Sequence, residues 1–146
     1  MSVFAPELIN LSMSAVDKVD AITQLAEMAV AAGRGRDAAQ IVADVIARDE
    51  LGTPQVEGVA IPHARSAGID EATVVVARFP HGVVFDPEED AADVVFMILV
   101  PEGAGDAHIQ ILAGLARRLM DEEFTAVLRT ANADDLLASL ANGEDN

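Results

Sequence analysis

The sequence predicts an α/β fold in which helices cover a sheet. Uninterrupted apolar runs, typical of buried strands, alternate along the chain with segments whose apolar residues recur every three or four positions. Glycine, proline and acidic residues separate these segments, as expected at turns and helix ends. A chain of 146 residues also fits one domain. We therefore expect a single α/β domain over residues 1–146.

The chain is expected to begin with one strand and one helix. A half-apolar stretch, residues 7–13, is interpreted as the first strand. Ser14 followed by Asp17 three positions later is typical of a helix start, and Gly33 ends that helix. Its predicted inner face consists of Val16, Val19, Ile22, Leu25, Ala26 and Ala29.

A second helix is expected to begin at Asp37 and to end within residues 48–52. Its predicted inner face consists of Ile41, Val45 and Ile46. The short apolar strand that follows should stop at Pro62, because proline has no N–H to donate and holds Ile61 extended. His63 would then lie on a loop at the carboxyl end of a strand, where the ligand crevices of open α/β sheets form.

The second half of the chain is expected to hold further strands and then helices. Strands are predicted at residues 73–79, 83–85 and 94–100, the last being the most apolar and therefore central. A turn at residues 80–82 separates the first two. Asp106 caps the next helix, which puts His108 in its first turn. The apolar face of that helix is Ile111, Leu112, Leu115, Ala116 and Leu119, and shorter helices follow at residues 122–130 and 134–141, before a frayed end at 142–146.

The composition excludes several classes of function. The chain has 25 acidic and 9 basic residues, a net charge of −16, and no Trp or Tyr. These features disfavour nucleic acids and anionic membrane surfaces as partners. Cysteine is absent, and no apolar run approaches the ~18–20 residues that span a bilayer. Residues 1–6 lack the pattern of a secretory signal, so we expect a cytoplasmic protein.

Residues 58–63 read Gly-Val-Ala-Ile-Pro-His and contain the candidate nucleophile, His63. By itself this segment also fits a surface histidine on a strand-to-loop turn. Matching segments accompany it in order, at residues 48–53, 64–65, 81–86, 94–102 and 108–119. Together they resemble the IIA domains of the fructose–mannitol family of the sugar phosphotransferase system, over residues 8–140.

The resemblance implies a fold and a function. The fold would be a mixed, mostly parallel sheet of about five strands flanked by helices. The protein would be a phosphoryl carrier that accepts phosphate from a phosphohistidine protein of the HPr type and passes it to a cysteine on a IIB domain of a sugar permease. Residues 96–104 look closest to the fructose branch. No metal or cofactor is implied, because the phosphoryl group moves between protein side chains.

The resemblance also implies roles for five residues. His63 would accept the phosphoryl group on Nε2 while a backbone carbonyl holds Nδ1. His108, near a helix N-terminus, would bind the phosphoryl oxygens, and Arg48 would support the phosphorylated form. Thr53 would donate one more hydrogen bond. For Arg65, a phosphate contact and a charge on the rim facing a partner remain equal alternatives.

Three alternatives accompany this interpretation. The chain could be a regulatory protein of the nitrogen-related IIA type, phosphorylated on the same His63. It could be a binding module that has lost phosphorylation, although the retained Arg48, His63 and His108 disfavour that. A zinc site built from His63, His108 and a carboxylate is disfavoured because no histidine pair has short metal-ligand spacing.

The acidic composition predicts a stability that depends on salt. Lys18 is the only lysine beside eight arginines and 25 acidic residues, and such a chain repels itself where salt does not screen the charges. At 1 M salt the Debye length is ~3 Å, so we expect the thermal unfolding midpoint to rise between low and molar salt. Calorimetry across this range tests the expectation. An unchanged midpoint would favour the alternative that a high-GC codon bias produced this composition.

Overall fold

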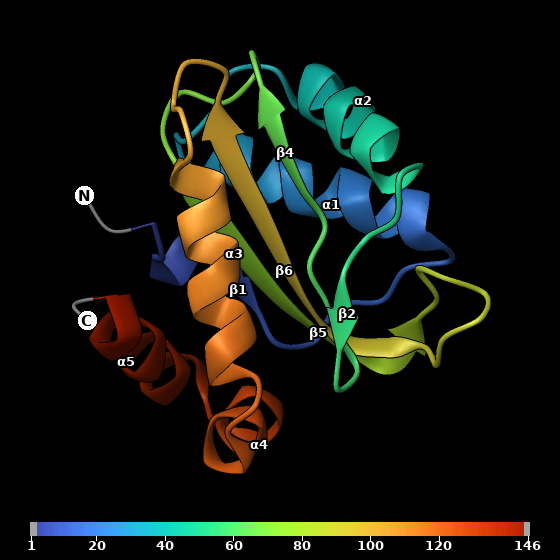
Figure 1. Cartoon of the computed structure of the whole chain (residues 1–146), viewed down its shortest axis with the longest axis vertical. Coiled ribbons are helices and arrows are strands. Elements are labelled where there is room, and N and C mark those ends of the chain that lie inside the picture. The colour runs from blue at the N-terminus through green and yellow to red at the C-terminus, as the bar shows by residue number, and fades with distance from the viewer. Residues whose placement is uncertain (1–2, 145–146) are drawn as a thin grey trace.

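The structure, a computed structural model, places a six-stranded sheet between two layers of helices (Figure 1). It describes residues 3–144, without the side chains of residues 107, 108 and 142–144. The strands are β1 (Ile9–Asn10), β2 (Gln55–Val56), β3 (Val59–Ala60), β4 (His63–Ser66), β5 (Thr73–Val83) and β6 (Ala92–Pro101). The helices are α1 (Lys18–Ala31), α2 (Ala38–Asp49), α3 (Ala107–Arg118), α4 (Glu122–Thr130) and α5 (Ala133–Glu144), and a 3-10 turn, η1 (Pro6–Leu8), precedes β1.

The sheet is mixed, as predicted. Its order is β1-β5-β6-β3-β2. β4 also pairs with β6, along the part of β6 that follows its pairing with β3. The pairs β1–β5, β3–β6 and β4–β6 are parallel, and the pairs β5–β6 and β2–β3 are antiparallel. The sheet has six strands rather than the expected five because β2 and β4 are additional, whereas the strand expected at residues 83–85 does not form separately. The predicted central position of β6 is confirmed.

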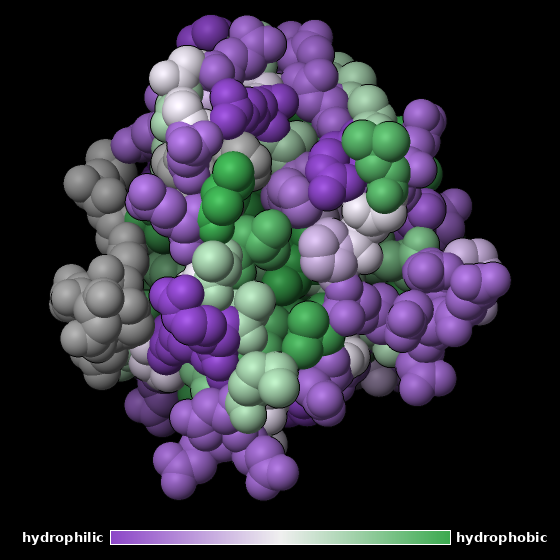
Figure 2. All heavy atoms as spheres, in the orientation of Figure 1, coloured by the Kyte–Doolittle hydropathy of each residue, from purple (hydrophilic) through white to green (hydrophobic). Residues whose placement is uncertain are grey.

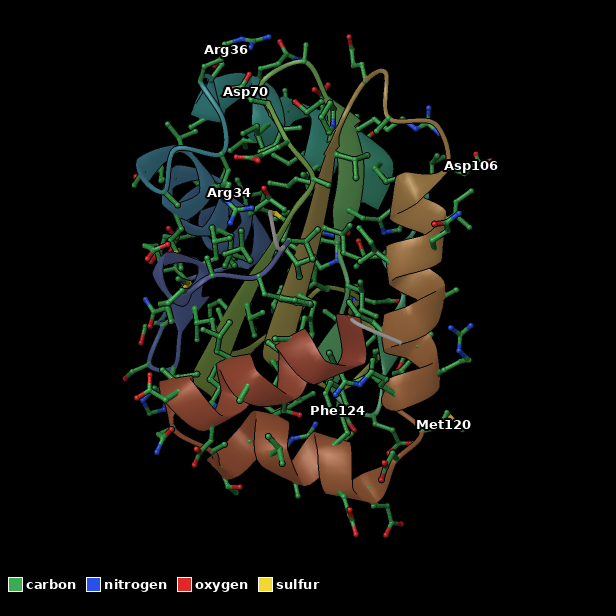
Figure 3. The ribbon with its side chains drawn as sticks, turned by 90° about the vertical axis from the view of Figure 1, so that its left-hand side faces the viewer. Arg34, Arg36, Asp70, Asp106, Met120 and Phe124 are labelled. Carbon is green, nitrogen blue, oxygen red and sulfur yellow. The ribbon has the colours of Figure 1, made fainter. Side chains whose placement is uncertain are left out.

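The core consists of two apolar layers, one on each face of the sheet. Side chains alternate across β6, so one set packs with α3, α4 and α5 and the other with α1 and α2. The first set is Val94, Phe96 and Ile98, and the second is Val95, Met97 and Leu99. Figure 3 shows these layers from the side, with the sheet between the α1–α2 layer and α3, and with Asp106 at the start of α3.

The first strand and the first helix start differ from the prediction. Within residues 7–13 only β1 pairs with the sheet, after the 3-10 turn. The side chain of Asp17, not Ser14, caps α1 by accepting a hydrogen bond from the Asp20 backbone N–H at 2.8 Å. Val16 therefore precedes the helix and is 92% exposed, and Val19, in the first turn, is 45% exposed. The buried face is Ala21, Ile22, Leu25, Ala26 and Ala29.

The predicted connection between the first two helices is confirmed. Gly33 follows α1 with a φ of 80°, a left-handed conformation that glycine adopts without a steric penalty. Asp37 caps α2, its carboxylate accepting the Gln40 backbone N–H at 3.1 Å. Ile41 and Val45 are buried, as expected.

β5 continues through the segment that was predicted to be a turn. The strand extends to Val83, and its register with β6 shifts between Arg78 and Val83. This bulge accommodates Pro80, which cannot donate to the ladder, and Gly82, which has a φ of 74°. Residues 83–85 are therefore not a separate strand.

The carboxyl-terminal helices agree closely with the sequence pattern. α4 has the predicted bounds, and α5 extends through residue 144 rather than fraying from residue 142. Residues 145 and 146 lie outside the described part of the chain. Asp106 is the N-cap of α3, but its side chain makes no capping hydrogen bond. Across residues 3–144, none of these helices combines the length and the apolar character needed to cross a bilayer.

The β2–β3 hairpin turns on Glu57 and Gly58, with φ values of 52° and 78°. Arg129 clamps this turn from α4: it donates to the Glu57 carbonyl and forms an ion pair with Asp93 at 2.7 Å. The hydrogen bond with Asp93 raises the pKa of Arg129 above its ordinary value. A Cβ on Gly58 would lie 2.9 Å from Arg129 Nη2.

We expect Gly58→Ala to lower the free energy of unfolding by about 1–2 kcal/mol, because alanine at positive φ is strained and its methyl group displaces the Arg129 clamp. Urea unfolding measures the change. The control is Gly103→Ala, where a Cβ meets no atom within 4 Å and where we expect a change below about 0.5 kcal/mol. Equal losses in the two variants would contradict this account.

Candidate functional site

His63 is the first residue of β4 and not a loop residue, which corrects the prediction that the strand stops at Pro62. Ala60 is opposite Val95 and His63 is opposite Ile98, so the register with β6 is kept across the proline. The Pro62 carbonyl still accepts the Ile98 N–H at 3.0 Å, although proline itself has no N–H to donate. Proline therefore interrupts the ladder without ending the parallel pairing.

His63 is buried in this arrangement, with a relative exposure of the residue of only 6%. Its Nδ1 lies 3.0 Å from the backbone carbonyl oxygen of Ile61. A carbonyl only accepts hydrogen bonds, so neutral His63 carries its proton on Nδ1 and its lone pair on Nε2. This is the contact that the resemblance implied for Nδ1. His63 also shares a sheet face with Ile98, which packs toward α3.

His63 lines an open pocket of about 280 Å³ together with Asp44, Arg48, Ala64 and Arg65. The pocket forms where α2 packs beside β4, and β4 pairs only with β6 among the described strands. Figure 2 shows the α3 side of the molecule: hydrophilic residues cover most of it, and hydrophobic residues gather near its centre. The exposed large apolar side chains include Leu51, just after α2, and Ile109, in the first turn of α3.

Arg48 lies in the last turn of α2 and is half-buried. Its Nη1 donates to the Gly52 carbonyl at 2.8 Å, so the guanidinium is tied to the turn that follows its own helix. Because Arg48 also lines the pocket, the structure brings it together with His63. Its planar group retains further N–H donors, which suit an anion with several oxygens.

Arg65 is exposed at the rim of the pocket, two residues after His63. Its Nη2 donates to the carbonyl of Gly105, in the loop just before α3. Arg65 thus connects β4 to the start of α3, and both of its predicted roles, phosphate contact and rim charge, fit this position.

Thr53 is not among the residues that line the pocket. Its hydroxyl donates to Asp49 Oδ1 at 2.5 Å, at the end of α2. The structure therefore does not bring Thr53 together with His63 in the way that the resemblance implied.

His108 is in the first turn of α3, as predicted, but its side chain lies outside the described part of the structure. The hydrogen bond from Arg65 to the Gly105 carbonyl places the loop just before α3 beside β4. The N–H groups at a helix start and the helix dipole favour an anion there.

Asp44 is a pocket residue that the sequence reasoning missed. It precedes Arg48 by four residues on α2, and this spacing, which puts both side chains on one helix face, was the signal that could have identified it. Gln40 Nε2 donates to both carboxylate oxygens of Asp44, at 3.1 and 3.0 Å. A carboxylate in this position offsets part of the positive charge that Arg48 and Arg65 bring to the pocket.

Within the described side chains, no three histidine, aspartate or glutamate residues gather as a metal site would require. The zinc alternative included His108, whose side chain is outside that description.

Comparisons with known proteins identify relatives of the chain. The family model described as "Phosphoenolpyruvate-dependent sugar phosphotransferase system, EIIA 2" matches residues 2–143. The PTS system fructose-specific EIIA component of Haloferax volcanii is 37% identical over 140 residues, which is 92% of this chain and 91% of that protein.

Two solved structures extend these comparisons. The nitrogen regulatory protein IIA-Ntr of Neisseria meningitidis has a TM-score of 0.81 and 26% identity, covering 93% of this chain and 94% of that one. The Escherichia coli complex of enzyme IIAMTL and phosphorylated enzyme IIBMTL has a TM-score of 0.79 and 29% identity, covering 95% and 97%.

We expect the neutral imidazole of His63 to carry its proton on Nδ1, because the Ile61 carbonyl accepts from that atom. Two-dimensional NMR that correlates the ring nitrogens with the ring protons measures the tautomer directly. His81, which is exposed, is the internal control and should exchange between both tautomers. A His63 signal from protonated Nε2 at neutral charge would overturn the assignment.

Proposed function

The chain belongs to the EIIA 2 family of the phosphoenolpyruvate-dependent sugar phosphotransferase system, and we propose that it is a phosphoryl carrier that works through His63. The observation that carries the proposal is the contact between His63 Nδ1 and the Ile61 carbonyl at 3.0 Å, in a pocket that also contains Arg48. This contact directs the lone pair of the imidazole to Nε2, the atom that would attack phosphorus.

The proposed reaction consists of two transfers. In the first, the His63 Nε2 lone pair forms a bond to phosphorus while the phosphorus–nitrogen bond of a phosphohistidine donor breaks, and that electron pair returns to the donor imidazole. In the second, a cysteine thiolate forms a bond to phosphorus, and the electron pair of the breaking bond returns to Nε2. The proton on Nδ1 stays in place throughout, held by the Ile61 carbonyl.

Positive charge and helix dipoles would hold the phosphoryl oxygens during both transfers. Arg48 reaches the pocket from α2, and Arg65 lies at its rim beside the loop before α3. His108, in the first turn of α3, would donate to the same oxygens. Because the group moves between protein side chains, the proposed transfers require no metal ion or cofactor.

The proposed partners are an HPr-type phosphocarrier as donor and the IIB domain of a sugar permease as acceptor, in the cytoplasm. Support for the acceptor comes from the 29% identical IIAMTL, whose structure is a complex with a phosphorylated IIB enzyme. Fructose is the proposed sugar of the system, by similarity to the fructose-specific relative. The exposed Leu51 and Ile109 offer apolar contact area to such partners.

A second candidate is a regulatory role, in which phosphorylation of His63 controls the binding of another protein. The likeness to IIA-Ntr supports it. Both candidates require phosphorylation of His63, and they differ in the next step. A transport component passes phosphate rapidly to a IIB cysteine, whereas a regulator keeps it and changes its binding partner.

We expect the protein to be labelled by phosphoenolpyruvate in the presence of enzyme I and an HPr-type carrier. The label should be acid-labile and base-stable, as a phosphoramidate is, and His63→Ala should abolish it because Nε2 is lost. Radiolabel incorporation and intact-protein mass spectrometry measure it.

His81→Ala is the matched control, since His81 is exposed on β5 away from the pocket lining, and it should be labelled like wild type. His108→Ala should accept phosphate but pass it to IIB at least about tenfold more slowly, because one donor to the phosphoryl oxygens is removed. A fully labelled His63→Ala protein would refute the carrier assignment.

A further inference from the structure

We propose that Lys18, Asp49 and Thr53 form a positioning network that fixes Arg48 in the pocket of His63. The inference rests on the phosphoryl-carrier function proposed above. It assigns a role to the only lysine of the chain and gives Thr53 a role that does not involve touching phosphate.

The centre of the network is the carboxylate of Asp49, the last residue of α2. Its side chain is only 7% exposed, and both oxygens are engaged. Oδ2 forms an ion pair with Lys18 Nζ at 2.7 Å, and Oδ1 accepts the Thr53 hydroxyl at 2.5 Å. A carboxylate that is this buried costs free energy unless it is paired and hydrogen-bonded, so removing either partner should disturb its position.

Lys18 brings two further parts of the chain to this point. It is the first residue of α1, and its Nζ also donates to the Phe85 carbonyl at 3.0 Å, just after β5. The start of α1, the end of α2 and the β5–β6 connection therefore meet at one ammonium group. This three-way contact anchors Asp49 to the body of the fold rather than to its own helix alone.

Hydrogen bonds in the turn after α2 link the position of Asp49 to that of Arg48. The Gly52 N–H donates to the Asp49 carbonyl at 2.8 Å, and Gly52 has a φ of 102°. The Gly52 carbonyl belongs to the planar peptide unit shared with Thr53, so anchoring Thr53 to Asp49 fixes the direction of that carbonyl. Arg48 Nη1 donates to this same carbonyl at 2.8 Å.

The consequence for function is that Arg48 is held ready before phosphate arrives. An arginine side chain has large rotamer freedom, and ordering it during the reaction would raise the barrier to transfer. Thr53 and Asp49 act through Arg48, because neither lines the pocket. They are therefore positioning residues, and Lys18 supports them.

The test compares Thr53→Val, Thr53→Ser and Asp49→Asn with wild type in the rate of phosphoryl transfer from an HPr-type carrier. Valine keeps the shape of threonine but cannot donate, so Thr53→Val should slow transfer about tenfold, whereas Thr53→Ser should stay within about twofold. Asp49→Asn should slow transfer similarly. The double variant Thr53→Val/Asp49→Asn should be no slower than the slower single variant, since both substitutions break the same series of contacts between Asp49 and Arg48.

Thr130→Val is the matched control, because Thr130 Oγ1 also donates to one oxygen, the Ala126 carbonyl at 2.6 Å, but on α4. It should leave the transfer rate unchanged. A second measurement does not depend on phosphoryl transfer: ¹⁵N NMR of the Arg48 guanidinium, assigned with Arg48→Lys. Wild type should show slow rotation of this group, and Thr53→Val and Asp49→Asn should show faster, averaged signals.

The outcomes separate the two proposals. If wild type takes no label, the carrier function fails, and the Arg48 signals still decide the positioning role. If wild type is labelled but Thr53→Val and Asp49→Asn keep wild-type rates and wild-type Arg48 signals, the positioning role is overturned. If Thr53→Val is slow while Asp49→Asn keeps the wild-type rate and Arg48 signals, Thr53 acts directly on phosphate and the network is likewise rejected.

Discussion

The site depends on the parallel pairing of β3 and β4 with β6 across Pro62. The hydrogen bond from the Ile98 N–H to the Pro62 carbonyl carries the register past a residue that cannot donate. Because the register holds, His63 is opposite Ile98 on the face that α3 covers, and the Ile61 carbonyl is left to meet Nδ1. The pairing of β4, the burial of His63 and the tautomer of its ring thus all depend on the short segment from Ile61 to His63.

Charge is distributed unevenly in this acidic protein, and Arg78, Arg118 and Arg129 make contacts that hold the fold together. Arg78 donates to carbonyls at the end of α4, and burial lowers its pKa. Arg118 stacks on the ring of Phe124 and donates to α5, and Arg129 clamps the β2–β3 hairpin. Arg48 and Arg65 differ because they line the pocket of His63. In a protein with a net charge of −16, these two guanidinium groups bring positive charge to the neighbourhood of His63.

The pattern of apolar residues and turn residues predicted strands and helix ends correctly where neighbouring residues in the sequence decide the structure. The apolar runs predicted β6 and most of β5, and the cap at Asp37 and the stop at Gly33 fixed the ends of the first two helices. The misplaced cap of α1 is a local error, decided by Asp17 and Asp20, but the missed hairpin lies where contacts distant in sequence decide. The turn at Glu57 and Gly58 lacks the Asn-Gly or Asp-Gly pair that marks such hairpins, and Arg129 holds it from the other end of the chain.

The sequence by itself determined the fold class, the family resemblance and the choice of His63, because these depend on periodicity and on residues close together in the chain. Only the tertiary structure decided how the other residues relate to His63. It brought Asp44 and Arg48 to the pocket and directed Thr53 to Asp49. The physical reason is that the Asp49 carboxylate, paired with Lys18 from a distant part of the sequence, is almost fully buried and accepts the Thr53 hydroxyl, and a contact of this kind is visible only once the chain is folded.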